Sequence, residues 1–238
     1  MYNSDELKDP ASLPNILKLL KKDPEFNRYC TQHRVAKGHV LKLTGDDRQF
    51  CYLLENGYLQ YNYTGPFAKG YFFFIKPGKF VSLPLFKNQV HAEADVVAVT
   101  DVIWWKIDFE FLRKMLLIED PKNYIVLNYT LEITYNFYMM TKKYLSSSED
   151  RIYFCLARLI DNGIQIKENQ VELPLFLTYD RLASISNVSK GYTANILTDL
   201  REEGILNASK KPWIVMDVAR LKAKLGIQAA HPDNTWGI

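Results

Sequence analysis

The chain has 238 residues, of which 47% are hydrophobic and 24% are charged. This is ordinary globular composition, and it excludes a disordered or collagen-like chain. The formal net charge of +3, from 30 Lys and Arg against 27 Asp and Glu, excludes a lysine-rich polycation but leaves open whether nucleic acid is a partner. The length predicts one or two domains.

No segment has the pattern of a membrane span or an export signal. The longest apolar runs, such as residues 71–75, fall far below the roughly 20 residues that cross a bilayer. The amino terminus contains acidic residues and no apolar core of a secretory signal. The three cysteines, Cys30, Cys51 and Cys155, are too scattered for a disulfide framework or a zinc site. We therefore expect a cytoplasmic protein with no membrane partner.

The first third of the chain has the pattern of β structure. Turn signals recur about every 8–12 residues, as in an all-β barrel or sandwich. The clearest predicted element is a hairpin over residues 50–61 that is closed by Asn56 and Gly57, because Asn-Gly tolerates positive φ at both central positions. Short helices are predicted before this block, over residues 13–22, and after it, over residues 109–117 with Asp108 as the N-cap.

Residues 124–145 contain no turn signal, which predicts one long helix, since a typical strand is much shorter. Its apolar side chains form two adjacent stripes, a wider surface than one neighbouring element usually covers. The first stripe holds Val126, Thr130, Ile133, Phe137, Met140 and Tyr144, and the second holds Leu127, Leu131, Thr134, Tyr138 and Leu145. Two interpretations are open: the helix is buried inside its own subunit, or it packs on its own barrel with one stripe and on a partner subunit with the other.

A polar stretch, residues 146–150, follows the long helix and supplies an N-cap for a helix over residues 151–160. Residues 164–166 and 171–173 alternate like the strands of a small hairpin. We place a domain boundary near residue 147. Residues 1–120 and 147–238 are expected to form two domains, with the long helix over residues 121–146 between them.

Residues 177–206 have the pattern of two short helices joined by a tight turn, with Thr178 and Ser189 as natural N-caps. Periodicity turns one set of side chains inward: Leu182, Ala183, Ile185, Thr193, Ile196, Leu197 and Leu200. The opposite side of the second helix carries Lys190, Gly191, Ala194, Asn195 and Thr198. Short side chains there let the backbone enter a DNA major groove about 12 Å wide. A turn with Lys210 and Lys211 then separates two strand-like segments, as in a β-wing that touches phosphates.

A β-roll, one long helix and a carboxy-terminal winged helix, in this order, resemble the Crp/Fnr family of bacterial transcription regulators. The best local match is residues 177–206, where leucine-threonine opens the first helix, serine and a basic residue open the second, and glycine-isoleucine ends it. Residues 77–81 also resemble the family's proline-glycine turn before a phenylalanine. The resemblance implies an α+β fold with an N-terminal double-stranded β-helix (jelly-roll) domain of the cyclic-nucleotide-binding type, a dimerisation helix and a winged helix-turn-helix domain.

The resemblance also implies that a homodimer binds DNA. The family's phosphate-contacting threonine and serine correspond to Thr178 and Ser189, and its base-reading positions fall on Lys190, Gly191 and Asn195. Many relatives carry arginine, glutamate and arginine at these three positions, so we do not expect the family's usual half-site. The expected DNA-binding residues are Thr178, Ser189, Lys190, Gly191, Tyr192, Asn195, Lys210 and Lys211. The expected dimerisation residues are Val126, Leu127, Leu131, Ile133, Thr134, Phe137, Tyr138, Met140 and Leu145.

The first domain lacks the residues with which cyclic-nucleotide members of the family hold their ligand. No arginine lies between Arg48 and Arg113, and residues 82–86 offer only apolar side chains and a hydroxyl. A guanidinium forms the bidentate phosphate clamp, for which lysine is a poor substitute. We therefore expect no cyclic-nucleotide dependence of the usual kind. The aromatic-rich barrel is interpreted as a filled core, with a site for an apolar or aromatic ligand as the alternative.

Other cofactors of the family are not expected either. Three dispersed cysteines cannot hold a four-cysteine iron–sulfur cluster. The histidines that are available as haem ligands, His33, His39 and His91, are interpreted as surface or core residues. Cys51 is interpreted as a small hydrophobic residue. An exposed thiol that senses oxidation stays an open alternative for Cys30, where only His33 and Arg34 nearby favour a lowered pKa. The expected cofactor content is none.

The sequence therefore predicts a sequence-specific DNA-binding transcription regulator rather than an enzyme, with a double-stranded operator as its partner and RNA polymerase as a further candidate. Residues 147–238 carry 11 basic and 11 acidic residues, a net charge of zero, which keeps open a winged helix that binds a protein instead. A β-barrel metalloenzyme is the other alternative, although the histidines are too irregularly spaced for clustered ligands. The operator, the target genes, the direction of regulation, the effector and any redox role of Cys30 or Cys51 stay open.

Overall fold

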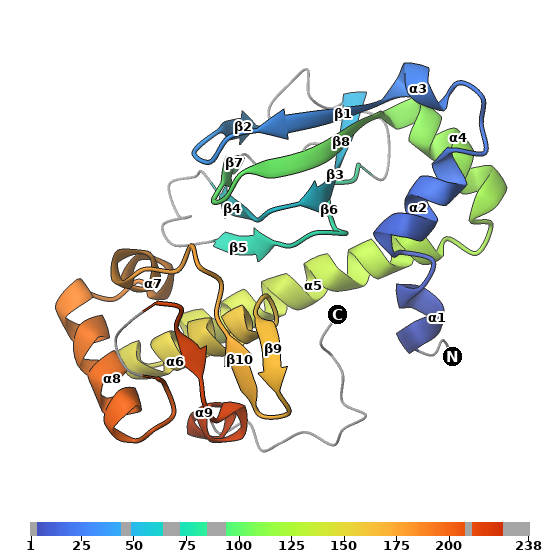
Figure 1. The fold of residues 1–238 in the computed structure, drawn as a ribbon. Coiled ribbons are helices and arrows are strands. Elements are labelled where there is room, and N and C mark those ends of the chain that lie inside the picture. Colours follow the sequence, from blue (N-terminus) through green and yellow to red (C-terminus); the bar gives the residue numbers. More distant parts are fainter. Residues whose placement is uncertain (1–3, 44–48, 64–71, 85–93, 208–210, 226–238) are drawn as a thin grey trace. The chain divides into compact units, whose positions relative to one another are not determined.

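The computed structural model describes residues 4–43, 49–63, 72–84, 94–207 and 211–225 (Figure 1). The chain packs as two compact units, Met1–Asn136 and Phe137–Gly237. The boundary falls inside the long helix α5 (Tyr124–Tyr144), whose predicted extent is confirmed to within one residue. The division into residues 1–120, 121–146 and 147–238 stays a prediction.

The first unit contains two four-stranded antiparallel sheets with helices before and after them (Figure 1). The helices are α1 (Ser4–Lys8), α2 (Leu13–Leu20), α3 (Phe26–Tyr29), α4 (Phe109–Glu119) and the first part of α5. One sheet has the order β1-β8-β3-β6, formed by Cys30–Val35, Val102–Asp108, Phe50–Asn56 and Phe80–Ser82. The other has the order β2-β7-β4-β5, formed by Val40–Lys42, Ala94–Ala98, Leu59–Tyr63 and Phe72–Ile75.

The hairpin predicted over residues 50–61 is wrong in its pairing, although both of its strands exist. β3 pairs with β6 and β8, whereas β4 pairs with β5 and β7 in the other sheet. Asn56 and Gly57 therefore turn the chain from one sheet to the other. Gly57 has φ of +84°, and a Cβ there would lie 2.3 Å from the carbonyl oxygen of Asp101. Glycine is needed at residue 57 because the backbone there lies against the backbone at Asp101, and not because residue 57 closes a tight hairpin.

Successive side chains along the strands point to opposite faces, so the first unit has two apolar cores. In β3, Tyr52 and Leu54 belong to a cluster formed by strand residues of both sheets, together with Trp104. Cys51 and Leu53 belong to a second cluster, which α2, α4 and α5 complete. This is the expected consequence of a period of two in a strand that is covered on both faces.

Asp108 begins α4 as predicted, since its carboxylate accepts a hydrogen bond from the backbone N–H of Phe111 at 2.9 Å. The structure excludes the alternative in which Cys30 is an exposed thiol. Only 3% of this residue is exposed, and burial, with a contribution from Asp108, raises the pKa of its thiol to about 12. Cys51 is fully buried, in agreement with its interpretation as a small hydrophobic residue.

The second unit combines the end of α5 with four further helices and a small sheet. The helices are α6 (Ser148–Ile160), α7 (Tyr179–Ser186), α8 (Lys190–Glu202) and α9 (Val218–Lys224). The antiparallel sheet has the order β11-β10-β9, formed by Ile214–Val215, Gln170–Glu172 and Ile164–Lys167. The polar stretch supplies an N-cap as predicted, through Ser147, whose hydroxyl accepts from the N–H of Asp150, but α6 starts at Ser148 and not at the predicted residue 151. The predicted hairpin of β9 and β10 is confirmed.

Lys143, near the end of α5, is a buried cation in the second unit. Its Nζ donates to the carbonyl oxygen of Ile185, the residue next to the end of α7, at 3.2 Å. Burial lowers the pKa of this ammonium, and the positive charge of Arg151 acts in the same direction. The bond connects α5 to α7 within this unit. None of the helices in the described ranges combines the length and the apolar character that a membrane span needs.

Candidate nucleic-acid interface

The α7–α8 pair is defined by its caps. The hydroxyl of Thr178 accepts from the N–H of Arg181 at 3.1 Å, and that of Ser189 accepts from the N–H of Tyr192 at 3.2 Å. Between the helices, Asn187 adopts a left-handed conformation with φ of +52°, which asparagine tolerates better than most residues. The chain thus leaves α7 and enters α8 within three residues, which fixes the two helices against each other.

One side of α8 is buried, as its periodicity predicted. Thr193, Ile196, Leu197 and Leu200 are all inside the unit. Thr193 is fully buried because its hydroxyl is satisfied by the carbonyl oxygen of Ser189, at 2.9 Å. Ala183 on α7 is also buried, and its small side chain allows the close approach of the second helix.

The other side of α8 is exposed and carries small or polar side chains. Lys190, Gly191, Asn195 and Thr198 are exposed, and Tyr192 is 39% exposed. A Cβ added to Gly191 would meet no heavy atom within 4 Å. Because no other part of the described protein approaches the helix backbone at Gly191, this face is available for contact with another molecule.

Lys190 forms an ion pair that the sequence analysis missed. Its Nζ lies 2.8 Å from a carboxylate oxygen of Asp180 on α7, and both side chains are mostly exposed. The pair draws the first cation of α8 toward α7 and places a negative charge beside the proposed base-reading positions. Only the packing of α7 on α8 brings the two residues together, so sequence spacing gave no signal for it.

Two arginines that are close in sequence to this face instead stabilise the interior. The guanidinium of Arg201 lies over the rings of Tyr179 and Trp213, at 5.6 and 5.9 Å from their centroids, and its Nε donates to the carbonyl oxygen of Asn207 at 3.3 Å. Arg181 lies over Phe176, and burial lowers the pKa of its guanidinium. Both act in cation–π packing rather than as exposed phosphate ligands.

The segment after α8 returns as a short antiparallel ribbon, since Leu206 bridges to Val215 in β11. Of the two lysines expected near its tip, Lys211 is exposed and its Nζ donates to the carbonyl oxygen of Leu175 at 3.2 Å. Lys210 lies outside the described residues. The ribbon therefore presents at least one cation beside the α7–α8 pair.

Comparison with known proteins identifies the fold through structure and not through sequence. No family model and no curated protein sequence matches the chain. Among solved structures, a cyclic nucleotide-binding domain containing protein from Listeria monocytogenes has a TM-score of 0.73 at 22% identity and covers 85% of this chain and 96% of its own. TTHB099, a transcriptional regulator of the CRP family from Thermus thermophilus, has a TM-score of 0.61 at 15% identity, and the match covers 82% of this chain and 97% of its own. FixK2 from Bradyrhizobium japonicum has a TM-score of 0.65 at 15% identity, and the match covers 85% of this chain and 98% of its own.

The chain has the Crp/Fnr fold. Because the similarity covers more than four-fifths of the chain in each case, the resemblance that the sequence predicted extends to both units. The α+β class with antiparallel sheets is confirmed.

In this Crp/Fnr fold, the residues expected at a subunit interface lie along α5 with unequal exposure. Tyr138 is 62% exposed, and Leu145, just beyond the helix, is 85% exposed. Val126 packs against the core of the first unit and Met140 is buried. The remaining expected residues are exposed at Thr134 and Phe137 and partly buried at Leu127, Leu131 and Ile133. Among the expected interface residues, Tyr138 and Leu145 are thus the most exposed apolar ones.

Of the residues in the first unit that the sequence analysis considered as ligand contacts, some are buried and some are on the surface. Ser82 and Leu83 are buried, whereas residues 85–86 and His91 lie outside the described residues. His33 and His39 are on the surface, where a ring nitrogen of His33 lies 2.9 Å from the hydroxyl of Thr31. Within the described part of the chain, no three His, Cys, Asp or Glu side chains gather as a metal site.

Proposed function

We propose that the protein is a homodimeric, sequence-specific DNA-binding transcription regulator, in which α7, α8 and the following ribbon form a winged helix-turn-helix. The observation that carries the proposal is the division of α8 into a buried apolar side and an exposed side with small and polar residues. A helix with such an exposed side can enter the major groove, where base edges carry a distinct pattern of donors and acceptors. Gly191, Asn195 and Thr198 give this side short side chains beside the larger Lys190 and Tyr192.

Base reading is assigned to two side chains on this face. Asn195, one and a half turns into α8, presents an amide that can pair with adenine in bidentate fashion. Lys190, at the start of α8, can donate to the O6 and N7 atoms of guanine once it leaves Asp180. Gly191 lets the backbone approach the bases or the sugar-phosphate chain. Tyr192 is assigned to the edge of the DNA contact that these residues form.

Phosphate contacts come from the helix starts and the wing. Thr178 and Ser189 lie at the N-caps of α7 and α8, where backbone N–H groups and the helix dipole attract anions. Lys211, together with Lys210, supplies the cations of the wing. Since residues 147–238 have no net charge, this attraction is local, and we expect affinity to fall steeply with salt.

Dimerisation is assigned to exposed apolar side chains near the end of α5, namely Phe137 and Tyr138 on the helix and Leu145 just after it. Two α8 helices related by a twofold axis would read a pseudo-palindrome with half-sites about 34 Å apart, one turn of DNA. We propose that this regulator works in the cytoplasm, has no enzymatic activity, does not depend on a cyclic nucleotide and regulates transcription by RNA polymerase. The absence of arginine between Arg48 and Arg113 supports the third point.

The experiment is a selection of bound sequences from random duplex DNA with the full-length protein, followed by mobility shifts on the selected site. Asn195→Ala and Lys190→Ala each lose a base contact worth about 1–3 kcal/mol, so each weakens specific binding. Lys167→Ala, an exposed lysine on β9, is the matched control and leaves binding unchanged. If both α8 variants bind the selected site as tightly as the wild type, the assigned face is wrong.

The zero net charge of the C-terminal part favours a second candidate, a winged helix that binds a protein. The same selection distinguishes the two. A protein-binding module enriches no DNA sequence at any salt concentration, and a partner copurifies with the wild type but not with the Asn195→Ala variant.

A further inference from the structure

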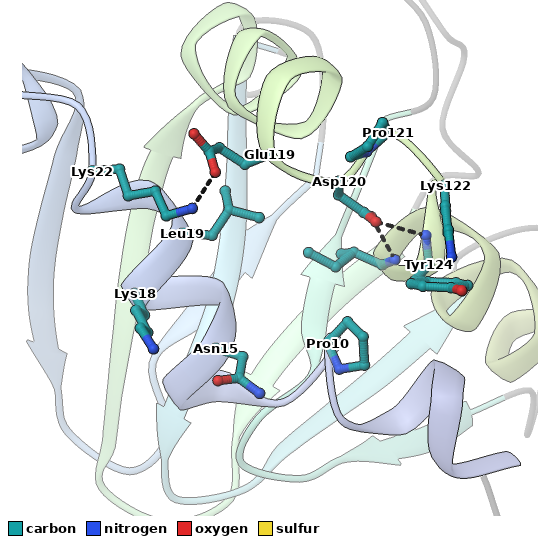
Figure 2. Close-up of a pocket in the computed structure, with 11 residues that line it drawn as sticks. Pro10, Asn15, Lys18, Leu19, Lys22, Glu119, Asp120, Pro121, Lys122 and Tyr124 are labelled. Carbon is teal, nitrogen blue, oxygen red and sulfur yellow. Dashed lines mark hydrogen bonds and ion pairs between the residues drawn. The ribbon is translucent and has the colours of Figure 1, made fainter.

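Most of the charged groups around the cavity between α2 and the α4–α5 corner are engaged with neighbouring groups of the first unit (Figure 2). Glu119 forms an ion pair with Lys22. Asp120 accepts from the backbone N–H of Tyr124 at 3.0 Å, and the Nζ atom of Lys122 lies over the ring of Tyr124. These contacts stabilise the first unit, whereas a buried cation in the second unit connects separate helices.

This cation is Lys143 near the end of α5, of which only 1% is exposed. Its Nζ atom donates to the carbonyl oxygen of Ile185 on α7 at 3.2 Å and lies 5.3 Å from the centroid of the Tyr144 ring. Burial of an ammonium group costs free energy, and an apolar side chain of similar length would fill the same space without that cost. Packing alone therefore does not account for a lysine at this position.

A second cation reaches the same end of α7 from α6. A terminal guanidinium nitrogen of Arg151 donates to the carbonyl oxygen of Asn187 at 3.3 Å. The thiol of Cys155, also on α6, donates to the carbonyl oxygen of Ile185 at 3.6 Å. The last carbonyls of a helix have no partner within the helix and carry the negative end of its dipole. Donors from both α5 and α6 therefore hold the end of α7 in place.

The position of α8 follows from the position of this end of α7. Only residues 187–189 separate the two helices. The N–H of Val188 in this turn donates to the carbonyl oxygen of Ala183 at 3.0 Å, so the turn is itself bonded to α7. Because Lys143 and Arg151 hold the end of α7, they also fix the start of α8 relative to α5 and α6.

The proposed dimer contact lies on another side of α5. Tyr138 is 62% exposed. It precedes Lys143 by five residues, which separates the two side chains by about 140° on a helix with 3.6 residues per turn. Tyr138, Lys143 and Ile185 all belong to the second unit. Within this unit, α5 thus presents Tyr138 to solvent and Lys143 to the end of α7.

We propose that Lys143 is a positioning residue for DNA recognition, which together with Arg151 fixes the α7–α8 turn against α5 and α6 and so sets the spacing at which two subunits present their α8 helices. This inference rests on the proposed function of a dimeric DNA-binding regulator. Because Lys143 is buried, it acts through the turn and not by contact with DNA. It therefore determines the preferred half-site spacing and not the preferred base sequence.

The experiment compares two duplexes, the selected site and the same site with its half-sites moved apart by two base pairs. The measured quantity is the ratio of the two affinities. For Lys143→Met and for Arg151→Met we expect this ratio to fall by about 2- to 30-fold, the range for a substitution that changes coupling without touching a ligand. Lys142→Met, at the exposed neighbouring lysine, is the matched control and keeps the wild-type ratio.

The ratio separates positioning from stability. A variant that is merely less stable has a smaller folded fraction, which weakens binding to both duplexes equally and leaves the ratio unchanged. Lys143→Met decides the test if it folds, and Arg151→Met decides it otherwise. A wild-type ratio in the deciding variant overturns the inference alone, whereas a wild-type protein that selects no duplex overturns the proposed function and the inference with it.

Discussion

Gly191→Ala separates the stability of α8 from its use in recognition. Glycine within a helix is less favourable than alanine by about 0.5–1 kcal/mol. Gly191 is the second residue of α8, and its added Cβ would meet nothing within 4 Å. Since the position lies in the first turn, we expect the lower value, a stabilisation of about 0.5 kcal/mol. Urea denaturation of the isolated protein measures it as a raised midpoint with an unchanged slope.

The same substitution should weaken DNA binding. If the helix backbone at Gly191 lies close to the bases or the sugar-phosphate chain, the methyl group takes up space that the contact needs. The loss should resemble that of one specific contact, about 1–3 kcal/mol or roughly 5- to 150-fold in affinity. Mobility shifts on the selected site measure it. Asp199→Ala, an exposed change near the other end of α8, is the control: it also stabilises the helix and does not weaken DNA binding.

The two effects therefore have opposite signs, which no purely structural role of Gly191 produces. A variant that is more stable and binds the site with wild-type affinity would refute the close approach of α8 at this residue. A variant that is less stable would refute the account of the helix itself.

Three further predictions follow from single contacts. Asp180→Asn frees Lys190 and removes a negative charge, so affinity for any duplex should rise about two- to fivefold; equal binding of random DNA by wild type and variant would contradict this. Because burial raises the pKa of Cys30 to about 12, a disulfide reagent at pH 8 should label Cys30 only slowly, and rapid labelling that peptide mapping assigns to Cys30 would show that this thiol is exposed. Burial lowers the pKa of Lys143 below its usual 10.5. Between the lowered value and 10.5 the unfolded state therefore binds a proton that the folded state lacks, so unfolding takes up a proton and stability rises with pH through this window. Lys143→Met should abolish that rise in denaturation curves, and an unchanged pH dependence would contradict the burial of the ammonium.

The helix starts could be predicted from the sequence because capping is local. Asp108, Thr178 and Ser189 each accept a hydrogen bond from an N–H three residues later, and this geometry depends only on neighbouring residues. In the polar stretch before α6, three consecutive serines are equivalent as caps by sequence, and the cap is Ser147. The inward side of α8 was predicted for the same reason, since its period of 3.6 is fixed by the helix. These two local features define most of the candidate interface.

Strand pairing could not be predicted in this way. Asn56 and Gly57 fit a hairpin turn and a connection between two sheets equally well. Which of the two forms depends on how β3 and β4 pair with β8 and β7, about 40 residues later in the chain. The burial of Cys30 and the ion pair of Lys190 with Asp180 have the same origin. Both depend on which elements pack together, and no spacing along the chain encodes that.

The most direct test is dimethyl sulfate footprinting of the full-length protein on its selected DNA, because the reagent methylates guanine N7 in the major groove. We predict protected guanines in two half-sites about 10 base pairs apart on one face of the duplex. Lys190→Ala should remove protection at one guanine in each half-site and leave the rest of the pattern intact. Guanines that stay reactive throughout a bound site, or protection without two related halves, would contradict a dimer that reads the major groove with α8.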